Sequence, residues 1–437
     1  MSRAGRLRAW YRSTEVVRGA VVGKRGIHHA APLWLVAREA PPLEQPAPPP
    51  LGWWVGEVGG RAIVEVRGRD AARFLQGLTT NDLLAAAATS RAGREEGRYT
   101  AFLTPTGRLL ADALVCQLPP GQQQQGQQEG EQTFLVECDA RAAPGLVVHL
   151  RRYRLRAHVD ITPPAQRPAA DEWAVGAVLT RGHVQSSSSS SSSGGGSGEA
   201  TPSPRDSLLQ CLRSHAPSLP CFADPRTAAM GIRVYHRRSS SFAPPPGLAE
   251  ASAKEYRLHR ILHAVPEGID ELEPNVAVPL ECNLDALNGV SYDKGCYLGQ
   301  ELTSRVHHTG VIRKRLMPVM CFSPEDEARE KELRVAERLL DFVHGRDQPS
   351  LERDHLLPSV LRELPSLATT NIASDKTELF LVGADGTPER RQVGRLCGGV
   401  EAGLAYHSRS HSLHNYCSFL SGQALVAATV PAAMTAT

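Results

Sequence analysis

The stretch Asn288-Gly-Val-Ser-Tyr-Asp-Lys-Gly-Cys-Tyr-Leu-Gly-Gln-Glu301 carries more information about this chain than any other. It places Cys296 two residues after Lys294, in a loop where Gly295 and Gly299 leave room for other groups to approach. Because a nearby ammonium group favours the thiolate form of a cysteine, this pattern is typical of a reactive thiol. The same residues also fit a small, buried cysteine in a tight turn, and the sequence alone leaves both interpretations open.

The residues on either side of this stretch supply acidic and basic groups. Glu281 and Glu301 could accept hydrogen bonds from the N–H edge of a heterocycle, or could instead cap a helix or pair with an arginine. A basic run from Lys294 to Arg315 suits an anionic tail or an acidic partner surface, although a solvated face has the same composition. No histidine–aspartate pairing with Cys296 is visible, so a protease-like nucleophile is not expected.

Outward from this stretch, short strand-like runs alternate with helical ones. The strand-like runs before residue 140 are 62–66, 99–103, 109–118 and 133–137. Between the first two, residues 70–78 place Phe74, Leu75 and Leu78 at helical spacing, with Asp70 suited to begin the helix. Further helices are expected at 140–150 and 251–264. The alternation predicts a mixed α+β fold.

The C-terminal part has a different pattern. Its strand-like runs are 316–322, 378–382, 392–397, 403–406 and 424–427. Glycine turns punctuate the last three runs, which is the pattern of a small antiparallel β-barrel. Three low-complexity or charged segments predict surface insertions: a Gln-rich hairpin loop at 121–132, a Ser/Gly tract from Ser186, and a charged segment at about 324–375.

The first 40 residues contain seven arginines against two glutamates, which is typical of an organelle transit peptide. A disordered basic arm would have the same composition. Because the leader is richer in Arg than in Ser, we expect the mitochondrial matrix rather than a plastid. Six prolines within residues 41–50 then predict a linker.

Composition excludes several classes of protein. The 49 basic and 46 acidic residues leave a formal net charge of +3, so no nucleic-acid partner is expected. No run approaches the ~18 apolar residues of a membrane span, so no membrane partner is expected. The nine cysteines include no Cys-x-x-Cys pair, which predicts neither a metal site nor a disulfide framework.

The segment Lys294-Gly-Cys-Tyr-Leu-Gly-Gln-Glu301 resembles the signature of the folate-binding YgfZ-like proteins, relatives of the glycine-cleavage T-protein. Three flanking motifs resemble the mitochondrial iron–sulfur assembly branch of that family: Val265-Pro-Glu-Gly268, Pro279-Leu-Glu-x-Asn283 and His307-His-x-Gly-Val-Ile-Arg-Lys-Arg-Leu316. Further support, in family order, comes from Phe74-Leu-Gln-Gly-Leu-Thr-Thr-Asn-Asp82, Phe102-Leu-x-Pro-x-Gly-Arg108 and Asp224-Pro-Arg-x-x-x-Met-Gly231.

The resemblance implies a three-domain cloverleaf of the T-protein type, with tetrahydrofolate in a central cavity and a C-terminal antiparallel β-barrel. On this basis, residues 51–160 and 224–315 form two intertwined α+β domains of the folate-binding type. Residues 161–223 connect them and contain the Ser/Gly insertion, and residues 316–437 form the barrel with its charged insertion.

The resemblance also assigns roles to individual residues. Glu281 matches the T-protein glutamate that grips the pterin edge, and Asp112 falls where the T-protein has two adjacent acidic residues, one of which activates the folate amine. Here the neighbour is Ala111, which argues against aminomethyl transfer because a general acid or base must reach the reacting nitrogen. The candidate catalytic residues are therefore Cys296, which belongs to the assembly branch, and Asp112. The expected cofactor-binding residues are Glu281, Asn283, Lys294, Tyr297, Gln300, Glu301 and Arg305.

The function implied is an assembly factor that acts in the maturation of [4Fe-4S] proteins and binds tetrahydrofolate. It would handle an iron–sulfur cluster only transiently, and its partners would be iron–sulfur cluster assembly proteins and [4Fe-4S] client proteins. A folate-dependent aminomethyl or one-carbon transferase is the alternative. An oxidoreductase with a redox-active thiol is less favoured, because no second cysteine lies near Cys296 in the sequence.

Overall fold

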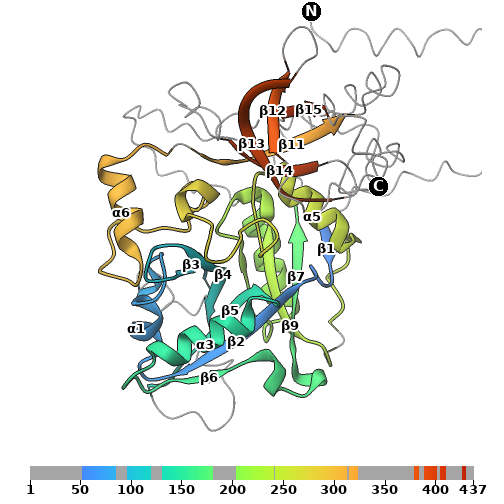
Figure 1. Ribbon diagram of the computed structural model, residues 1–437. Helices are drawn as coiled ribbons and strands as arrows, with labels where there is room; N and C mark the ends of the chain where they lie inside the picture. Colours follow the sequence, from blue (N-terminus) through green and yellow to red (C-terminus); the bar gives the residue numbers. More distant parts are fainter. Residues whose placement is uncertain are drawn as a thin grey trace, which may run out of the picture. The chain divides into compact units, whose positions relative to one another are not determined.

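The structure is a computed structural model that describes residues 52–84, 96–119, 130–180, 203–240, 242–312, 314–322, 378–382, 388–400, 404–409 and 426–429. The described strands form three sheets of five strands each (Figure 1). Helices and strands occur together along the chain, which confirms the mixed α+β class. The expected transit peptide, the proline-rich linker, the serine tract and the charged insertion lie outside the described residues and stay predictions.

The first sheet, called the β2 sheet, has the order β3-β4-β5-β2-β6 and is antiparallel throughout. Its strands are β2 (Arg61–Gly68), β3 (Gly97–Leu103), β4 (Leu109–Gln117), β5 (Gln132–Asp139) and β6 (Asp160–Thr162). Because successive side chains of a strand point to opposite faces, Val64 packs with the helices α1 (Ala71–Gln76) and α3 (Ala143–Tyr153), while Ile63 points the other way. Figure 1 shows both helices beside this sheet.

The β7 sheet has the order β10-β1-β7-β9-β8. Its strands are β1 (Gly52–Val55), β7 (Trp173–Leu179), β8 (Cys221–Ala223), β9 (Ile232–Arg237) and β10 (Leu248–Glu250), and only the β1–β10 pair is parallel. One face packs on helix α4 (Pro204–His215) through Val178 and Val234. The other face contributes Val175 and Tyr235 to the core that also holds Ile63. The two sheets therefore share one hydrophobic core.

The remaining elements before residue 316 are mostly short. The 3₁₀ helices are η4 (Pro164–Gln166), η5 (Ala169–Asp171), η6 (Ala228–Met230) and η7 (Pro279–Cys282). Helix α5 (Ala253–Leu262) begins with a capping box, in which the Ser252 side chain accepts from the Glu255 N–H and the Glu255 carboxylate accepts from the Ser252 N–H. Helix α6 (Gln300–Thr309) follows the informative stretch directly.

The third sheet contains β11 (Leu316–Phe322), β12 (Glu378–Val382), β13 (Pro388–Val400), β14 (Leu404–Arg409) and β15 (Val426–Thr429), in the order β12-β13-β14-β11-β15. The bounds of β11 and β12 coincide with the expected strand runs. All described pairs are antiparallel except β11–β15. The C-terminal barrel and the cloverleaf stay predictions.

Three expected helices have different boundaries in the structure. Helix α3 begins three residues later than expected and continues to Tyr153. Helices α1 and α5 are shorter than expected, at Ala71–Gln76 and Ala253–Leu262. Asp70 does occupy the N-cap position of α1, but its carboxylate accepts from the backbone N–H of His158 at 2.8 Å instead of capping the helix. A hydrogen bond from His158, distant in sequence, thus replaces the expected cap of the α1 backbone by Asp70.

Candidate functional site

The segment Asn288–Gly299, called the thiol loop from here on, is bound along its length to one short stretch of chain, residues 76–81. Backbone hydrogen bonds run from Leu298 N–H to the Gly77 carbonyl and from Ser291 N–H to the Thr80 carbonyl, both at 3.0 Å. Side chains add to these bonds, since the Thr80 hydroxyl donates to the Gly289 carbonyl at 2.6 Å and the Asn81 amide donates to the Asn288 carbonyl at 2.7 Å. Two of the sequence motifs therefore fold against each other.

Lys294 supplies the central contact between the thiol loop and this stretch. Its ammonium group donates to the backbone carbonyls of Gln76, Thr79 and Asn81 at 2.7, 2.6 and 2.9 Å. It also lies 5.0 Å from the centroid of the Tyr297 ring. Burial lowers the pKa of Lys294 to about 8, opposed by the charge of Asp82. The ammonium form therefore still predominates at neutral pH and has three N–H donors for three acceptors.

Cys296 lies at the exposed part of the thiol loop and is a free thiol. Its exposure excludes the interpretation as a small buried cysteine, and its reactivity stays a prediction. Cys211 on α4 is the other exposed free cysteine among those whose side chains the structure describes. The buried ones are Cys116, Cys138, Cys221 and Cys282. In the described part of the chain, no group of three or more His, Cys, Asp or Glu side chains is arranged to hold a metal ion.

Two glycines fix the C-terminal end of the thiol loop. Gly299 has φ +79°, and a Cβ atom there would lie 2.4 Å from the Thr104 carbonyl oxygen. Gly107, also left-handed, would place a Cβ 2.9 Å from the carbonyl oxygen of Gly299. Only glycine combines this backbone conformation with so close an approach. The turn at residues 104–107 thus contacts the thiol loop in addition to residues 76–81.

The predicted cofactor-binding residues of helix α6 and the adjoining loop have different surroundings. The Gln300 side-chain oxygen accepts from the Tyr297 backbone N–H at 3.0 Å, across the start of the helix. Tyr297 packs against the hydrophobic core, and burial raises the pKa of its hydroxyl, opposed by a hydrogen bond with Thr303. Glu301 and Arg305 are exposed. Four of the predicted residues therefore share one helix start, but only Glu301 and Arg305 face solvent.

Glu281 and Asn283 lie at and just after the 3₁₀ helix η7. Asn283 is buried in a left-handed conformation, and its amide donates to the Leu316 carbonyl at 2.7 Å. Its side-chain oxygen has no hydrogen-bond partner among the described residues. Glu281 is half-buried, and within the described ranges its carboxylate has no hydrogen bond or ion pair. Glu281 is thus available to a ligand, whereas the Asn283 amide joins the η7 loop to β11.

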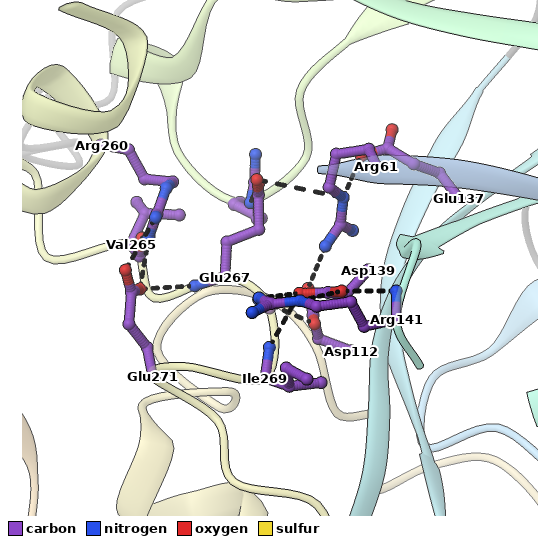
Figure 2. Close-up of polar contacts among 12 residues, drawn as sticks. Arg61, Asp112, Glu137, Asp139, Arg141, Arg260, Val265, Glu267, Ile269 and Glu271 are labelled. Carbon is purple, nitrogen blue, oxygen red and sulfur yellow. Dashed lines mark hydrogen bonds and ion pairs between the residues drawn. The ribbon is translucent and has the colours of Figure 1, made fainter. Parts of the chain in front are cut away.

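Asp112 belongs to a separate cluster of buried charges that the sequence analysis did not predict. This cluster, called the charged core, consists of Arg61, Asp112, Glu137, Asp224, Arg226, Arg233 and Glu267. Strand alternation places Asp112 on β4 on the same face of the β2 sheet as Leu114. Its carboxylate accepts from Arg61 at 3.4 Å (Figure 2) and from the Gly268 backbone N–H at 3.1 Å. Among the described residues, no hydrogen bond or ion pair joins Asp112 to the thiol loop. The two candidate catalytic residues therefore lie in different environments.

Arginines and carboxylates alternate through the charged core. Arg61 donates to Glu137 at 2.8 Å, and Arg233 on β9 donates to the same carboxylate at 2.9 Å. Glu267 then accepts from Arg226 at 2.6 Å and from Arg233 at 3.0 Å. Further bonds come from Asp224, Tyr235 and Tyr256. The network joins β2 and β5 of one sheet to β9 of the other.

The electrostatics of the charged core differ from one carboxylate to the next. Burial raises the pKa of Asp112, and the Arg61 guanidinium opposes that shift. Burial would also raise the pKa of Glu267, but the guanidinium groups of Arg61, Arg226 and Arg233 hold it well below its usual range. Glu267 is therefore ionised at neutral pH, whereas burial favours the protonated form of Asp112.

Two polar atoms in the charged core lack a partner among the described residues, the hydroxyl of Tyr99 and one terminal nitrogen of Arg61. Tyr99 is fully buried on β3, and Asp112 and Arg226 are among the charges that shift the pKa of its hydroxyl. Buried polar groups are normally hydrogen-bonded to protein or to water. These two atoms are thus places where a water molecule or a polar ligand atom would be stabilised.

A second buried ion pair, Arg260 with Glu271, lies beside this network. The Arg260 guanidinium donates to the Glu271 carboxylate at 2.8 Å and to the Val265 carbonyl at 2.8 Å (Figure 2). Glu271 in turn accepts from the Glu267 backbone N–H at 2.9 Å. The motif Val265-Pro-Glu-Gly268 is therefore held by charged groups on both sides. Charged residues on the core-facing side of strands were the sequence signal that could have indicated this cluster.

Comparison with known proteins places the chain in a family. No protein-family model matches it. It is 37% identical over 323 residues to the human protein named iron-sulfur cluster assembly factor IBA57, mitochondrial, a match that covers 71% of this chain and 79% of that protein. The mouse protein of the same name is 35% identical over 321 residues, with the same coverage. An Aspergillus oryzae homologue is 33% identical and covers 65% of this chain and 60% of that protein.

A solved structure of glycine cleavage system aminomethyltransferase T from Bartonella henselae covers 82% of this chain and 78% of that chain, with 11% identity and a TM-score of 0.44. That likeness is too weak to carry an argument. The sequence relatives are mitochondrial iron–sulfur cluster assembly factors by name. The chain belongs to the IBA57 family of these factors. The family resemblance and the mitochondrial location predicted from the sequence are thereby confirmed. In the described residues, no helix has the length and apolar character needed to cross a membrane.

Proposed function

We propose that this protein acts in the mitochondrial matrix in the maturation of [4Fe-4S] proteins, with Cys296 as the residue that contacts the cluster in transit. The observation that carries the proposal is one exposed, free thiol on a loop that many hydrogen bonds hold in place. The proposal is also supported by the sequence relatives, which are named iron–sulfur cluster assembly factors. Its partners would be other assembly proteins and the [4Fe-4S] client proteins.

The proposal makes the cluster a cargo. One cysteine supplies only one ligand, while a cluster is normally held by several thiolates. The remaining ligands would therefore come from a partner protein or from a small thiol, and exposure of Cys296 is what such sharing requires. A thiol that is exposed but fixed in position presents its sulfur to a partner at a low cost in conformational entropy.

We further propose that the chain binds tetrahydrofolate. The residues present fit a polar heterocycle, because the half-buried Glu281 carboxylate has no hydrogen bond or ion pair among the described residues. Glu281 would accept from the N–H edge of the pterin ring. Bound tetrahydrofolate would supply a carrier for one-carbon units.

The same residues do not support aminomethyl transfer. Asp112 is 2% exposed, its oxygens are engaged by Gly268 and Arg61, and Ala111 stands where a second acidic residue would be needed. A general acid or base must reach the reacting atom in a plausible substrate pose. We therefore favour binding without turnover over the one-carbon transferase alternative.

The decisive experiment depletes the protein and measures the activity of mitochondrial [4Fe-4S] enzymes together with lipoylation, which itself requires a [4Fe-4S] enzyme. We expect both to fall, and to recover when the wild-type chain is expressed. Unchanged activities after depletion would overturn the assembly proposal. Titration of the purified protein with tetrahydrofolate, and an aminomethyl-transfer assay on the same sample, test the folate proposal separately. Turnover would favour the transferase alternative.

A further inference from the structure

Three backbone carbonyls converge on the Lys294 ammonium group from a stretch of only six residues, 76–81. The first belongs to Gln76, the last residue of helix α1, and the other two follow within the next turns of chain. Carbonyl groups at the C-terminal end of a helix lack partners within the helix and carry partial negative charge. The stretch thus forms a small site for a cation, and Lys294 fills it from within the same protein.

The geometry suits an ammonium group in particular. An ammonium has three N–H donors on one nitrogen, which match three converging carbonyl oxygens. A guanidinium is a planar fork and presents its donors in one plane, so it does not fit the same three acceptors. All three distances, between 2.6 and 2.9 Å, are those of charge-assisted hydrogen bonds.

In the sequence, the Cys296 thiol lies between two contacts to residues 76–81, one made by Lys294 and the other by Leu298. Cys296 is two residues after Lys294 and two residues before Leu298, whose backbone N–H donates to the Gly77 carbonyl at 3.0 Å. Between the two contacts, a Cβ atom at Gly295 would meet no other atom within 4 Å. Cys296 is exposed. The span that carries the thiol is therefore held by a hydrogen-bonded contact at each end, and Tyr297 packs against the hydrophobic core beside the second contact.

We propose that Lys294 is a positioning residue that fixes the Cys296 thiol by acting as an internal cation among the carbonyls of residues 76–81. The role of the thiol in cluster handling rests on the proposed function, but the positioning itself does not. Lys294 would contact neither cluster nor cofactor. Its function would be to keep residues 294–298 in one conformation, so that the sulfur is presented in the same place each time.

The test replaces the side chain and supplies its head group separately. In Lys294→Ala, we expect amide hydrogen exchange in peptides that cover the thiol loop to accelerate by about tenfold or more, because charge-assisted hydrogen bonds are lost. Adding methylammonium chloride should restore protection, because its ammonium group can occupy the same three carbonyls. Tetramethylammonium chloride at equal concentration should not, because that ion has no N–H donor.

Matched variants separate positioning from folding. Lys314 is an exposed lysine with no hydrogen bond or ion pair to the described part of the chain, and Lys314→Ala should leave exchange in the thiol loop unchanged. Lys294→Arg keeps the charge but not the donor geometry, and should lose protection without losing the fold. If Lys294→Ala does not fold, Lys294→Arg decides the matter. If Lys294→Arg and Lys294→Ala both showed the wild-type rate of amide exchange in the thiol loop, the proposal would be overturned. Equal protection of Lys294→Ala by methylammonium and tetramethylammonium would also overturn it. None of these measurements involves a cluster, so they fail independently of the proposed function.

Discussion

The guanidinium group of Arg226 donates to the carboxylate of Glu267 at 2.6 Å, with both side chains almost completely buried. Removing one partner of such a pair leaves an uncompensated charge in the interior. We expect Glu267→Gln to lower the free energy of unfolding by about 3–5 kcal/mol, measured by urea denaturation. Asp270→Asn is the control, because Asp270 pairs with Arg141 where both are about half exposed, and it should cost less than about 1 kcal/mol. Equal costs would contradict the assigned role of the buried pair.

The same carboxylate predicts a pH dependence. The arginines hold the pKa of Glu267 well below its ordinary value of 4.5. A carboxyl group whose pKa is depressed by folding stabilises the protein above its unfolded-state pKa, and this contribution is lost as the pH falls through the folded-state pKa. The stability difference between wild type and Glu267→Gln should therefore be constant at neutral pH and shrink below about pH 4.5. Urea denaturation at several pH values measures it, and a difference independent of acid pH would contradict the shift.

Two buried tyrosines of the charged core should respond differently to loss of the hydroxyl. The Tyr256 hydroxyl bonds to Arg233, Glu267 and Arg226, whereas the Tyr99 hydroxyl has no partner among the described residues. We expect Tyr256→Phe to cost about 2 kcal/mol of stability and Tyr99→Phe less than about 0.5 kcal/mol. Thermal or urea denaturation of the two variants makes the comparison. A large cost for Tyr99→Phe would mean that a buried water holds its hydroxyl.

Gly299 and Gly295 form a matched pair within the thiol loop. Gly299→Ala places a methyl group 2.4 Å from the Thr104 carbonyl oxygen in a left-handed conformation, whereas Gly295→Ala meets nothing within 4 Å. The first should destabilise the protein by about 2 kcal/mol or more, and the second by less than about 1 kcal/mol. Denaturation midpoints of the two variants test the difference, and similar values would mean that the 104–107 turn does not support the loop as described.

The two exposed cysteines allow a direct test of the thiol. We expect Cys296→Ser to fail to restore [4Fe-4S] enzyme activity in depleted cells, because the hydroxyl is a poor cluster ligand. Cys211→Ser should restore it, because Cys211 lies on α4, apart in sequence from the thiol loop. Immunoblots must show equal amounts of both variants. Equal rescue by the two would remove Cys296 from the function.

Much of the strand pattern could be predicted from local sequence. The runs 316–322 and 378–382 match β11 and β12, because alternating or continuous apolar residues between turns are a local signal. Strand β1 and the pair β7 and α4 were missed. β1 is a four-residue run rich in tryptophan, and β7 and α4 flank the Ser/Gly tract, whose composition dominates that region.

Charged residues on the core-facing side of strands signal the charged core, but which of them pair could not be predicted, because the partners are far apart in the sequence. Arg233 and Glu137 are 96 positions apart and meet only when the two sheets pack face to face. From the sequence, a charged residue in a strand indicates a solvent-facing position, and that rule fails here. Lys294 was assigned to cofactor binding for a related reason, since its three acceptors are backbone carbonyls more than 200 positions away that leave no side-chain signature. The cofactor-binding assignment is untested, and the positioning role is our alternative to it.

The carbonyl acceptors of Lys294 have an evolutionary consequence. Every amino acid carries a backbone carbonyl, so the ammonium group recognises the path of the chain at 76, 79 and 81 and not the identity of the residues there. Side chains at those three positions can therefore change without removing an acceptor, provided that the turn keeps its shape. Selection therefore acts mainly on the lysine, because a single substitution of Lys294 removes all three hydrogen bonds, whereas substitutions at 76, 79 and 81 remove none of the acceptors.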